Sequence, residues 1–555
     1  MHKTVLILVG LILLSQLTYG MQEKPEVIVE INPNLELFAV VYILAFNGSD
    51  YFIIAPQSYV KDVLTYFAPY REHEAVYLIR EAFPRDLSLY VRDDSIMSWS
   101  NQLSSLPYLG NESEDDPLLS DMLRALVSFA KESNFMKFYN AHREEYEKAV
   151  SPLRELFGNE FPEKFREFFG YIYENYRIEF SYSLKIHPHS WRRYDTLYYI
   201  GTALQNLNNF SIQFQAITAF HEFSHQFINP VMQRNLKLFE NVSYYLSEAK
   251  NEFPILTTYD MYHFSSEYAY FAETLTEAFA VYLAMNSNIS PAVVKYRVLW
   301  YSSWNFPLLE DFVKEYENFE KIKKPNETFE DYLPTLAEHM HKWATPGNIT
   351  DYFKQKVPVT SKWAVDRAYY MGKIIIVYGT QNPLREGNEY DKETAFELKD
   401  TLEKRFKGFY PQKPTILIKA DTNLTDEDLK QNLLLIGGPA ANKITEKLAS
   451  KLPISFIFNE TWRLRRAPVV VNKFEAFFVR DSIKELSLNE EIPEEYPLGV
   501  IEVIRNPWNG ENFIILIAGI DRYSTRKMAR KFYNVPSSYV IIGKTHHEIG
   551  FYMQR

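Results

Sequence analysis

Apolar and polar positions follow a helical period through the middle of the chain. Between residues 118 and 343, apolar side chains recur at helical spacing and charged side chains fall on the opposite faces. This pattern predicts a series of amphipathic helices. The clearest candidates are Leu118–Val150, Pro162–Tyr176 and Ser265–Met285, and two or three more helices are expected from there to Trp343.

Shorter patterns precede and interrupt these helices. A helix is predicted over Gln57–Phe67, and alternating or apolar runs that favour strands lie at Val27–Ile31, Leu37–Ala45, Arg177–Ile186 and Thr196–Ile200. Asn32-Pro33-Asn34 separates the first two of these runs and is typical of a turn.

The character of the chain changes near Val357-Pro358. Beyond this point, short apolar runs occur at Lys373–Tyr378, Thr415–Lys419, Leu433–Ile436 and Phe513–Ala518. Charged helical segments alternate with them at Lys392–Phe406, Lys443–Lys451 and Thr525–Phe532. Such alternation predicts an α/β domain with a largely parallel sheet, beginning at about residue 358.

The first twenty residues have the features of an export signal. Met1-His2-Lys3 is a short basic start, Val5–Leu14 is apolar, and Thr18-Tyr19-Gly20 places small residues where a signal peptidase cleaves. We favour cleavage after Gly20, which gives a secreted or cell-surface protein; the alternative is a retained N-terminal anchor.

Composition narrows the classes of function. The 555 residues are enough for two or three domains, and a hydrophobic content of 46% can fill their cores. A net charge of −11 argues against nucleic acid as a partner. The chain has no cysteine, so an exported form must be stable without disulfides. Abundant Glu and Lys favour a thermophilic source.

Asn-x-Ser/Thr triplets recur along the chain. They predict glycosylation in a host that glycosylates exported proteins. The triplets begin at Asn47, Asn111, Asn209, Asn241, Asn288, Asn326, Asn348, Asn423 and Asn459.

One motif carries specific chemistry. In His221-Glu222-Phe223-Ser224-His225, the two histidines are four residues apart, so on a helix both imidazoles can reach a single metal ion. Glu222 can then act as general base towards water activated by zinc. The flanking residues are uncharged, and Asn229-Pro230 offers a helix end. The plainer interpretation is a buried helix with two hydrogen-bonded core histidines.

A zinc peptidase needs a third protein ligand. Glu273 and Glu277 lie one turn apart in an otherwise apolar helical segment. Buried carboxylates are costly unless they are paired or bind metal. One of them can therefore ligate zinc while the other accepts the outer N–H of a ligand histidine. The simpler alternative is that one or both face solvent.

These motifs resemble the gluzincins, zinc peptidases with two histidine ligands and one glutamate. Glu277-Ala278-Phe279-Ala280 is similar to their Glu-x-Phe-Ala pattern, which implies Glu277 as ligand. The N-terminal two-thirds more closely resembles a domain-of-unknown-function family of exported zincin-like proteins. The segments that carry this second resemblance are Val29–Leu37, Tyr66–His73 and His221–Pro230. In that family the later motif is close to Glu-x-Leu, which Glu273-Thr274-Leu275 matches, so we favour Glu273 as ligand.

Other residues are weaker candidates. A hydrogen-bond donor for the reaction oxyanion could come from Tyr259, Tyr262, His263, Tyr268 or Tyr270. His73 could line a cleft, but a lone histidine is more often structural. His546-His547-Glu548 is best explained by chance.

Ile436-Gly437-Gly438-Pro439-Ala440-Ala441-Asn442 follows a predicted strand and precedes a helix. It lacks both the GxGxxG spacing and a Lys-Ser/Thr pair, so a tight turn is a better interpretation than a phosphate loop. Similar units resemble accessory domains of exported archaeal proteins, including surface-layer-like ones.

Together these observations predict three parts: a signal peptide at 1–20, a zincin-like α+β domain at 21–357 that is mainly helical around the metal site, and a smaller α/β accessory domain at 358–555. We expect an exported zinc-dependent peptidase that acts on peptide or protein substrates. In this interpretation His221, His225 and Glu273 hold Zn²⁺ and Glu222 is the base. The accessory domain could attach the enzyme to the cell envelope or surface layer. The rival interpretation is an envelope-binding or structural protein on a catalytically vestigial zincin scaffold.

Overall fold

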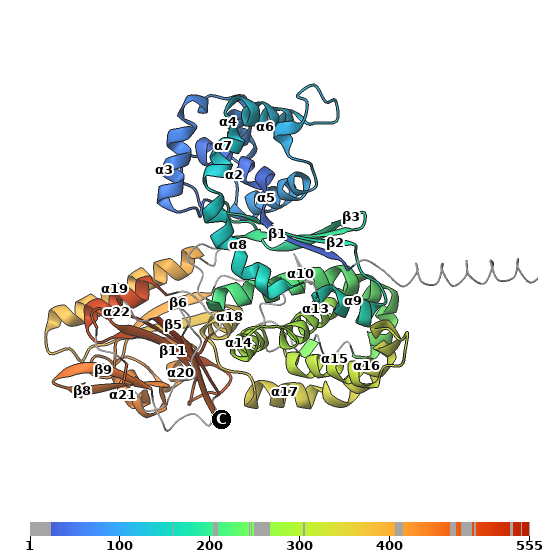
Figure 1. The fold of residues 1–555 in the computed structure, drawn as a ribbon. Coiled ribbons are helices and arrows are strands. Elements are labelled where there is room, and N and C mark those ends of the chain that lie inside the picture. Colours follow the sequence, from blue (N-terminus) through green and yellow to red (C-terminus); the bar gives the residue numbers. More distant parts are fainter. Residues whose placement is uncertain are drawn as a thin grey trace, which may run out of the picture. The chain divides into compact units, whose positions relative to one another are not determined.

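The computed structural model describes most of the chain: residues 24–158, 160–203, 209–242, 245, 247–248, 267–303, 306–405, 414–466, 473–478, 491–492, 495–532, 537–544 and 547–553. They form two compact units, Met1–Asn206 and Leu207–Arg555 (Figure 1). The domain boundary predicted near residue 357 lies inside the second unit.

Two predictions concern export. The signal segment 1–20 lies outside the described residues. Among the residues described, no helix combines the length and the apolar character that crossing a bilayer requires. Six of the asparagines in the predicted glycosylation sites are exposed, as that modification requires: Asn47, Asn111, Asn288, Asn326, Asn348 and Asn423.

The first unit contains a four-stranded sheet in the order β1-β2-β4-β3. Its strands are β1 (Glu26–Ile31), β2 (Asn175–Ser181), β3 (His189–Arg193) and β4 (Thr196–Thr202). Strands β1, β2 and β4 are parallel, and β3 pairs with β4 in the antiparallel sense. The predicted strands at Val27–Ile31 and Thr196–Ile200 are confirmed, while the one at Arg177–Ile186 ends earlier than expected.

Helices gather beside this sheet, as Figure 1 shows in blue for α2 to α7. Their bounds are α2 (Pro33–Ala45), α3 (Gln57–Tyr66), α4 (Glu74–Ala82), α5 (Leu89–Ser104), α6 (Asp121–Glu132), α7 (Phe135–Ala141), α8 (Arg143–Phe157) and α9 (Phe161–Phe169). The predicted helical stretch from residue 118 to 150 is thus divided among three helices.

The predicted strand at Leu37–Ala45 is wrong, because this segment belongs to α2. The Asn32 side chain accepts hydrogen bonds from the N–H groups of Asn34 (2.8 Å) and Leu35 (3.2 Å) and so caps the helix. Pro33 is suited to the first helical turn. Every residue from Asn34 to Ala45 is buried, so the sequence carries no period that distinguishes a helix from a buried strand.

The second unit begins with helices. Their bounds are α10 (Asn209–Asn235), α13 (Glu267–Met285), α14 (Pro291–Ser302), α15 (Leu309–Ile322), α16 (Phe329–Trp343), α17 (Pro346–Gln355) and α18 (Ser361–Tyr370). Helix α10 packs along α13, and α13 also packs against α15. The three helices that follow Met285 confirm the prediction for that stretch.

Helix α10 does not end at Asn229-Pro230, as the sequence predicted. It continues to Asn235 with Pro230 inside it. A proline costs a helix one backbone hydrogen bond. Phe227 and Met232, on either side of Pro230, have no exposed surface, and the packing of such side chains outweighs the lost bond.

The rest of the second unit is built on an eight-stranded sheet in the order β10-β14-β13-β11-β12-β7-β5-β6. The strands are β5 (Lys373–Tyr378), β6 (Thr415–Ala420), β7 (Leu433–Ile436), β10 (Lys473–Phe478), β11 (Gly499–Arg505), β12 (Phe513–Gly519), β13 (Tyr539–Ile542) and β14 (His547–Met553). Its helices are α19 (Arg385–Arg405), α20 (Asp426–Leu429), α21 (Lys443–Leu448) and α22 (Arg522–Arg530), and β8 (Ile454–Asn459) and β9 (Thr461–Arg466) form a separate hairpin.

The sheet is mixed, and the prediction of a largely parallel sheet holds only for its β12-β7-β5-β6 half. The other strands pair in the antiparallel sense. Charged residues interrupt the apolar pattern of β10, β11 and β14, and β13 has only four residues, so the sequence did not predict them. The structure buries these charges: Arg466 of β9 donates to Glu548 of β14 at 2.8 Å, and Glu502 of β11 is also fully buried.

Residues on either side of the predicted boundary at 357 pack together. The ring of Phe353 on α17 lies 5.9 Å from the ring of Trp363 on α18. Trp363 in turn lies 5.3 Å from Phe513 on β12, and Arg505 on β11 donates to the carbonyl of Phe353 at 3.1 Å. These contacts explain why residues 207–555 form one compact unit rather than two.

Candidate metal centre

The two motif histidines lie side by side on α10. His221 and His225 are one turn apart, so the helix places both rings on the same face. Their Nε2 atoms are 3.2 Å apart. Both side chains are largely buried, with 11% and 15% of their surface exposed.

Glu273 on α13 completes a cluster with these histidines. Its two carboxylate oxygens each lie 3.5 Å from one histidine, Oε2 from His221 Nε2 and Oε1 from His225 Nε2. Four-coordinate zinc with bonds of about 2.0–2.2 Å keeps its ligand atoms roughly 3.3–3.6 Å apart. One ligand atom from each of the three residues lies within 4.8 Å of the others, close to the spacing of tetrahedral zinc, and three protein ligands would leave a fourth position for water or substrate.

Glu277 lies behind this cluster rather than in it. Its side chain has no exposed surface, and its Oε2 is 2.8 Å from His221 Nδ1, a short contact that is not aligned as a good hydrogen bond. Arg297 on α14 donates two hydrogen bonds to the same carboxylate, from Nε at 2.7 Å and from Nη2 at 2.9 Å. A carboxylate on the outer nitrogen of a ligand histidine fixes the tautomer of its ring.

Arg297 is itself fully enclosed. Its Nη1 donates to Thr218 Oγ1 on α10 at 2.9 Å. Its guanidinium carbon lies 4.6 Å from the ring centre of Phe214 and 4.5 Å from that of Tyr301. An arginine with only 1% of its surface exposed is stable there because Glu277 balances its charge. The arginine thereby connects α10, α13 and α14.

These contacts shift the pKa values of the site. Burial lowers the pKa of His221, but the Glu273 and Glu277 carboxylates more than offset it and raise that pKa to about 10. Burial raises the pKa of Glu277, but Arg297 and His221 outweigh it, so the pKa falls below its usual value. In the metal-free chain, His221 thus carries a proton that a metal ion has to displace.

The outer nitrogen of His225 faces the same helix. Its Nδ1 lies 3.4 Å from Asn229 Oδ1, one turn further along α10. Helix α10 holds the two residues four positions apart, so both side chains lie on the same face.

Glu222 is adjacent to the cluster on α10. It is partly exposed, and its charge acts on His221, Arg297 and Tyr301. Tyr301 on α14 is partly buried, and this burial raises its pKa, so its hydroxyl remains protonated at neutral pH. A partly exposed carboxylate that directly follows a potential metal ligand in the chain can act as a general base.

Tyr259, Tyr262, His263, Tyr268 and Tyr270 were the sequence candidates for the oxyanion donor. Tyr259, Tyr262 and His263 lie outside the described residues, as does the side chain of Tyr268. Tyr270 is buried, 5.7 Å from the ring of Tyr245.

Three further candidates have structural roles. His73 caps α4 by accepting the N–H of Ala75 at 3.1 Å. Glu548 is held by Arg466 and by the hydroxyl of Tyr539, while His546 lies outside the described residues. Asn442 caps α21 and donates to the carbonyls of Val377 and Ile436, which ties the ends of β5 and β7 together. The glycine-rich turn at residues 437–442 therefore has the structural role that the sequence favoured.

Sequence reasoning missed Arg297, Thr218, Asn229 and Tyr301. For Arg297 a signal existed: it stands among apolar and aromatic residues of α14, where a charged side chain needs a buried partner. Thr218, Asn229 and Tyr301 gave no such signal, because their roles depend on which helices meet.

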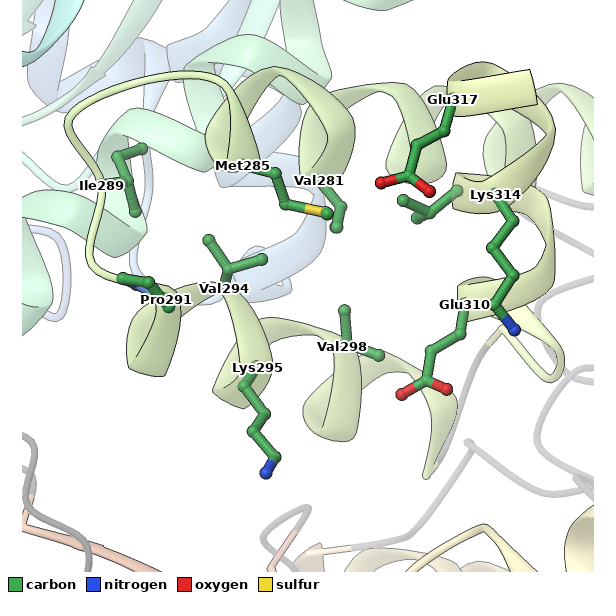
Figure 2. Close-up of a pocket in the computed structure, with 11 residues that line it drawn as sticks. Val281, Met285, Ile289, Pro291, Val294, Lys295, Val298, Glu310, Lys314 and Glu317 are labelled. Carbon is green, nitrogen blue, oxygen red and sulfur yellow. The ribbon is translucent and has the colours of Figure 1, made fainter. Parts of the chain in front are cut away.

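A groove opens further along the helix that carries both glutamates. Val281 and Met285 of α13 line it together with Val294 and Val298 of α14, and its volume is about 500 Å³. Figure 2 shows these apolar side chains on its walls and Lys314 of α15 on its margin. It lies beyond Glu277 along α13 and adds no ligand to the metal cluster.

Comparison with known proteins finds a family match for part of the chain. Residues 391–535 match the model of the S-layer like family, outer domain. None of the curated proteins matches the chain. The match lies within the predicted accessory domain and supports its resemblance to surface-layer-associated domains. It indicates association with the cell surface, while the zincin-like resemblance of residues 21–357 stays a prediction.

Proposed function

We propose that this chain is an exported zinc-dependent peptidase held at the cell surface through its C-terminal region. The observation that supports it most is the convergence of His221, His225 and Glu273 from two helices, with Glu222 beside them. Ordinary core histidines do not need a carboxylate equidistant from both Nε2 atoms. The surface location rests on the match of residues 391–535.

The residues fit a division of roles. His221, His225 and Glu273 would hold the ion, and Glu277 with Arg297 would fix the orientation of His221. When bound, zinc supplies a Lewis acid that acidifies water and polarises the scissile carbonyl. Glu222 accepts the proton that the attacking water releases and returns it to the leaving amine nitrogen.

A second function belongs to a different class. The S-layer match also fits a structural or binding protein of the envelope in which the zincin scaffold is vestigial. The presence of Glu222 favours the enzyme, since a vestigial site gains nothing from a base beside the metal ligands.

One experiment separates these two functions. The full-length chain is loaded with zinc, its metal content is measured, and hydrolysis of denatured casein is followed for wild type and Glu222→Gln. The enzyme predicts about one zinc per chain and hydrolysis that Glu222→Gln abolishes while zinc is retained. Zinc without any hydrolysis of casein or of a random peptide library would favour the vestigial scaffold, and a chain that takes up no zinc would reject the zinc peptidase and leave the structural or binding protein.

A further inference from the structure

A cavity lies where the chain leaves three parallel strands of the large sheet. Strands β5, β7 and β12 run parallel and end at the same edge, at Tyr378, Ile436 and Gly519. From β5 the chain passes to β6 on one side and then returns to β7 on the other. Such a change of direction leaves a crevice at the carboxyl ends of the strands, where α/β proteins bind ligands. The cavity here has a volume of about 430 Å³, within the range of small-molecule sites.

Asp391 on α19 lines this cavity and has an unsatisfied carboxylate. Only 2% of the residue is exposed, and Oδ1 has no hydrogen-bond partner among the described residues. Burial raises its pKa to about 7, against the opposing effect of Arg526 and Arg522. A buried acceptor without a partner is costly, and the cost is removed when a ligand supplies a donor.

The turn after β7 faces this carboxylate. Gly437 has a φ of +100°, and a Cβ atom placed there would lie 3.6 Å from Asp391 Oδ2. The backbone therefore approaches the carboxylate closely without a side chain between them.

Aromatic rings form another part of the wall. Phe456 and Trp462, from the β8–β9 hairpin, line the cavity together with Tyr523 at the start of α22. Flat apolar rings beside polar groups suit a ligand that has both a C–H face and hydroxyl groups.

The charges at the site select among ligands. Arg522 also lines the cavity, but a phosphate or carboxylate ligand would be repelled by the buried Asp391 carboxylate. A metal ion needs several oxygen ligands, and the other carboxylate lining the cavity, Asp521, is engaged as the cap of α22 through the N–H of Ser524 at 2.7 Å. A neutral ligand rich in hydroxyl groups carries no charge for Asp391 to repel, and it can donate a hydrogen bond to this carboxylate.

We propose that the cavity bounded by Asp391, Gly437 and Trp462 binds a neutral saccharide. A sugar hydroxyl donates to Asp391 Oδ1, and the C–H face of the ring packs on the aromatic wall. Since most residues that line the cavity belong to the part of the chain that matches the S-layer like family, its ligand would be a glycan of the cell surface. This site shares no residue with the metal cluster, so binding is independent of peptidase activity.

Saturation-transfer NMR on the full-length chain tests the proposal with mannotetraose, maltotetraose and chitotetraose as probes. We expect at least one of them to bind at millimolar concentration. Asp391→Ala should weaken that binding roughly 10- to 100-fold, the usual effect of losing a hydrogen bond to a charged group. Trp462→Ala should also weaken it. The controls are Glu386→Ala, an exposed carboxylate on α19, and Phe458→Ala, an exposed ring of the same hairpin that does not line the cavity.

A second measurement separates a ligand-binding residue from a structural one. Because Asp391 Oδ1 has no hydrogen-bond partner in the described part of the chain, Asp391→Ala should unfold at the same temperature as wild type or higher. The proposal is overturned if none of the three sugars binds, if binding survives Asp391→Ala, or if inorganic phosphate or Ca²⁺ binds more tightly than every sugar. Loss of binding that accompanies a lower unfolding temperature in Asp391→Ala would also overturn it, since the residue would then be structural.

Discussion

Replacing Glu277 by glutamine tests whether Glu277 and Glu273, which look alike in the sequence, have different roles. Glu277 is fully buried and carries two hydrogen bonds from Arg297, whereas Glu273 is partly exposed and faces the two histidines. Glu277→Gln preserves the size of the side chain but removes its charge. The guanidinium of Arg297, 1% exposed, then remains in the interior without a counter-charge.

The expected cost follows from this burial. Breaking a buried ion pair by removing one partner costs about 3–5 kcal/mol, and the glutamine oxygen can still accept one hydrogen bond, so we expect about 3 kcal/mol. Glu273→Gln should cost the metal-free chain less, because Glu273 is partly exposed and solvent screens its contact with the protonated His221. For zinc affinity, Glu273→Gln should be the more damaging variant. Glu277→Gln should weaken zinc binding by about 10- to 100-fold, and Glu273→Gln should weaken it more.

Urea unfolding of the metal-stripped, full-length chain, followed by tryptophan fluorescence, measures the first effect, and competition with a chromogenic chelator measures the second. Glu338→Gln is a matched control, since its ion pair with Lys342 is exposed and should contribute nothing measurable. The double variant Glu277→Leu, Arg297→Met should recover most of the lost stability. The reasoning is refuted if Glu277→Gln unfolds at the same urea concentration as wild type, or if Glu273→Gln is equally destabilised.

Three further predictions concern the metal site. His221→Ala and His225→Ala should each abolish stoichiometric zinc in metal analysis of the purified chain, and full zinc content in either variant would contradict the ligand assignment. Glu222→Gln should keep zinc yet lower peptide hydrolysis by at least about 10²-fold, so unchanged turnover would exclude Glu222 as the base. Because the metal-free His221 holds its proton up to a pKa of about 10, zinc affinity should rise with pH, by about tenfold per unit for one displaced proton; calorimetric titration that shows a flat response below pH 10 would contradict this.

The histidine motif was predictable because its chemistry depends on local spacing. His221 and His225 meet on one face of any helix that contains them, so no knowledge of packing was needed. The choice between Glu273 and Glu277 was not predictable in this way. Both glutamates lie on one side of α13, and their roles differ because Arg297 donates two hydrogen bonds to Glu277. That contact depends on the packing of α14, which the sequence pattern does not encode.

The secondary-structure elements, too, were predicted correctly where local sequence determines them and wrongly where contacts between distant residues do. Strands β5, β7 and β12 were found because buried parallel strands are continuous apolar runs. Helix α2 was mistaken for a strand for the same reason, since complete burial removes the helical period. The domain boundary at 357 was placed where the pattern changes, but Phe353 and Trp363 pack across it.

The hydrogen bonds from Asn442 to the ends of β5 and β7 give a means of recognising distant relatives of this domain. A Cβ atom at Gly379 would lie 2.1 Å from the carbonyl oxygen of Ala441, so the position excludes every other residue unless the turn moves. Asn442 caps α21 and bonds both strand ends, and few side chains can replace it. A glycine after the first strand and an asparagine opening the helix after the third should therefore occur together or be lost together. Searches that weight this pair should identify chains of this architecture even where their surfaces have diverged.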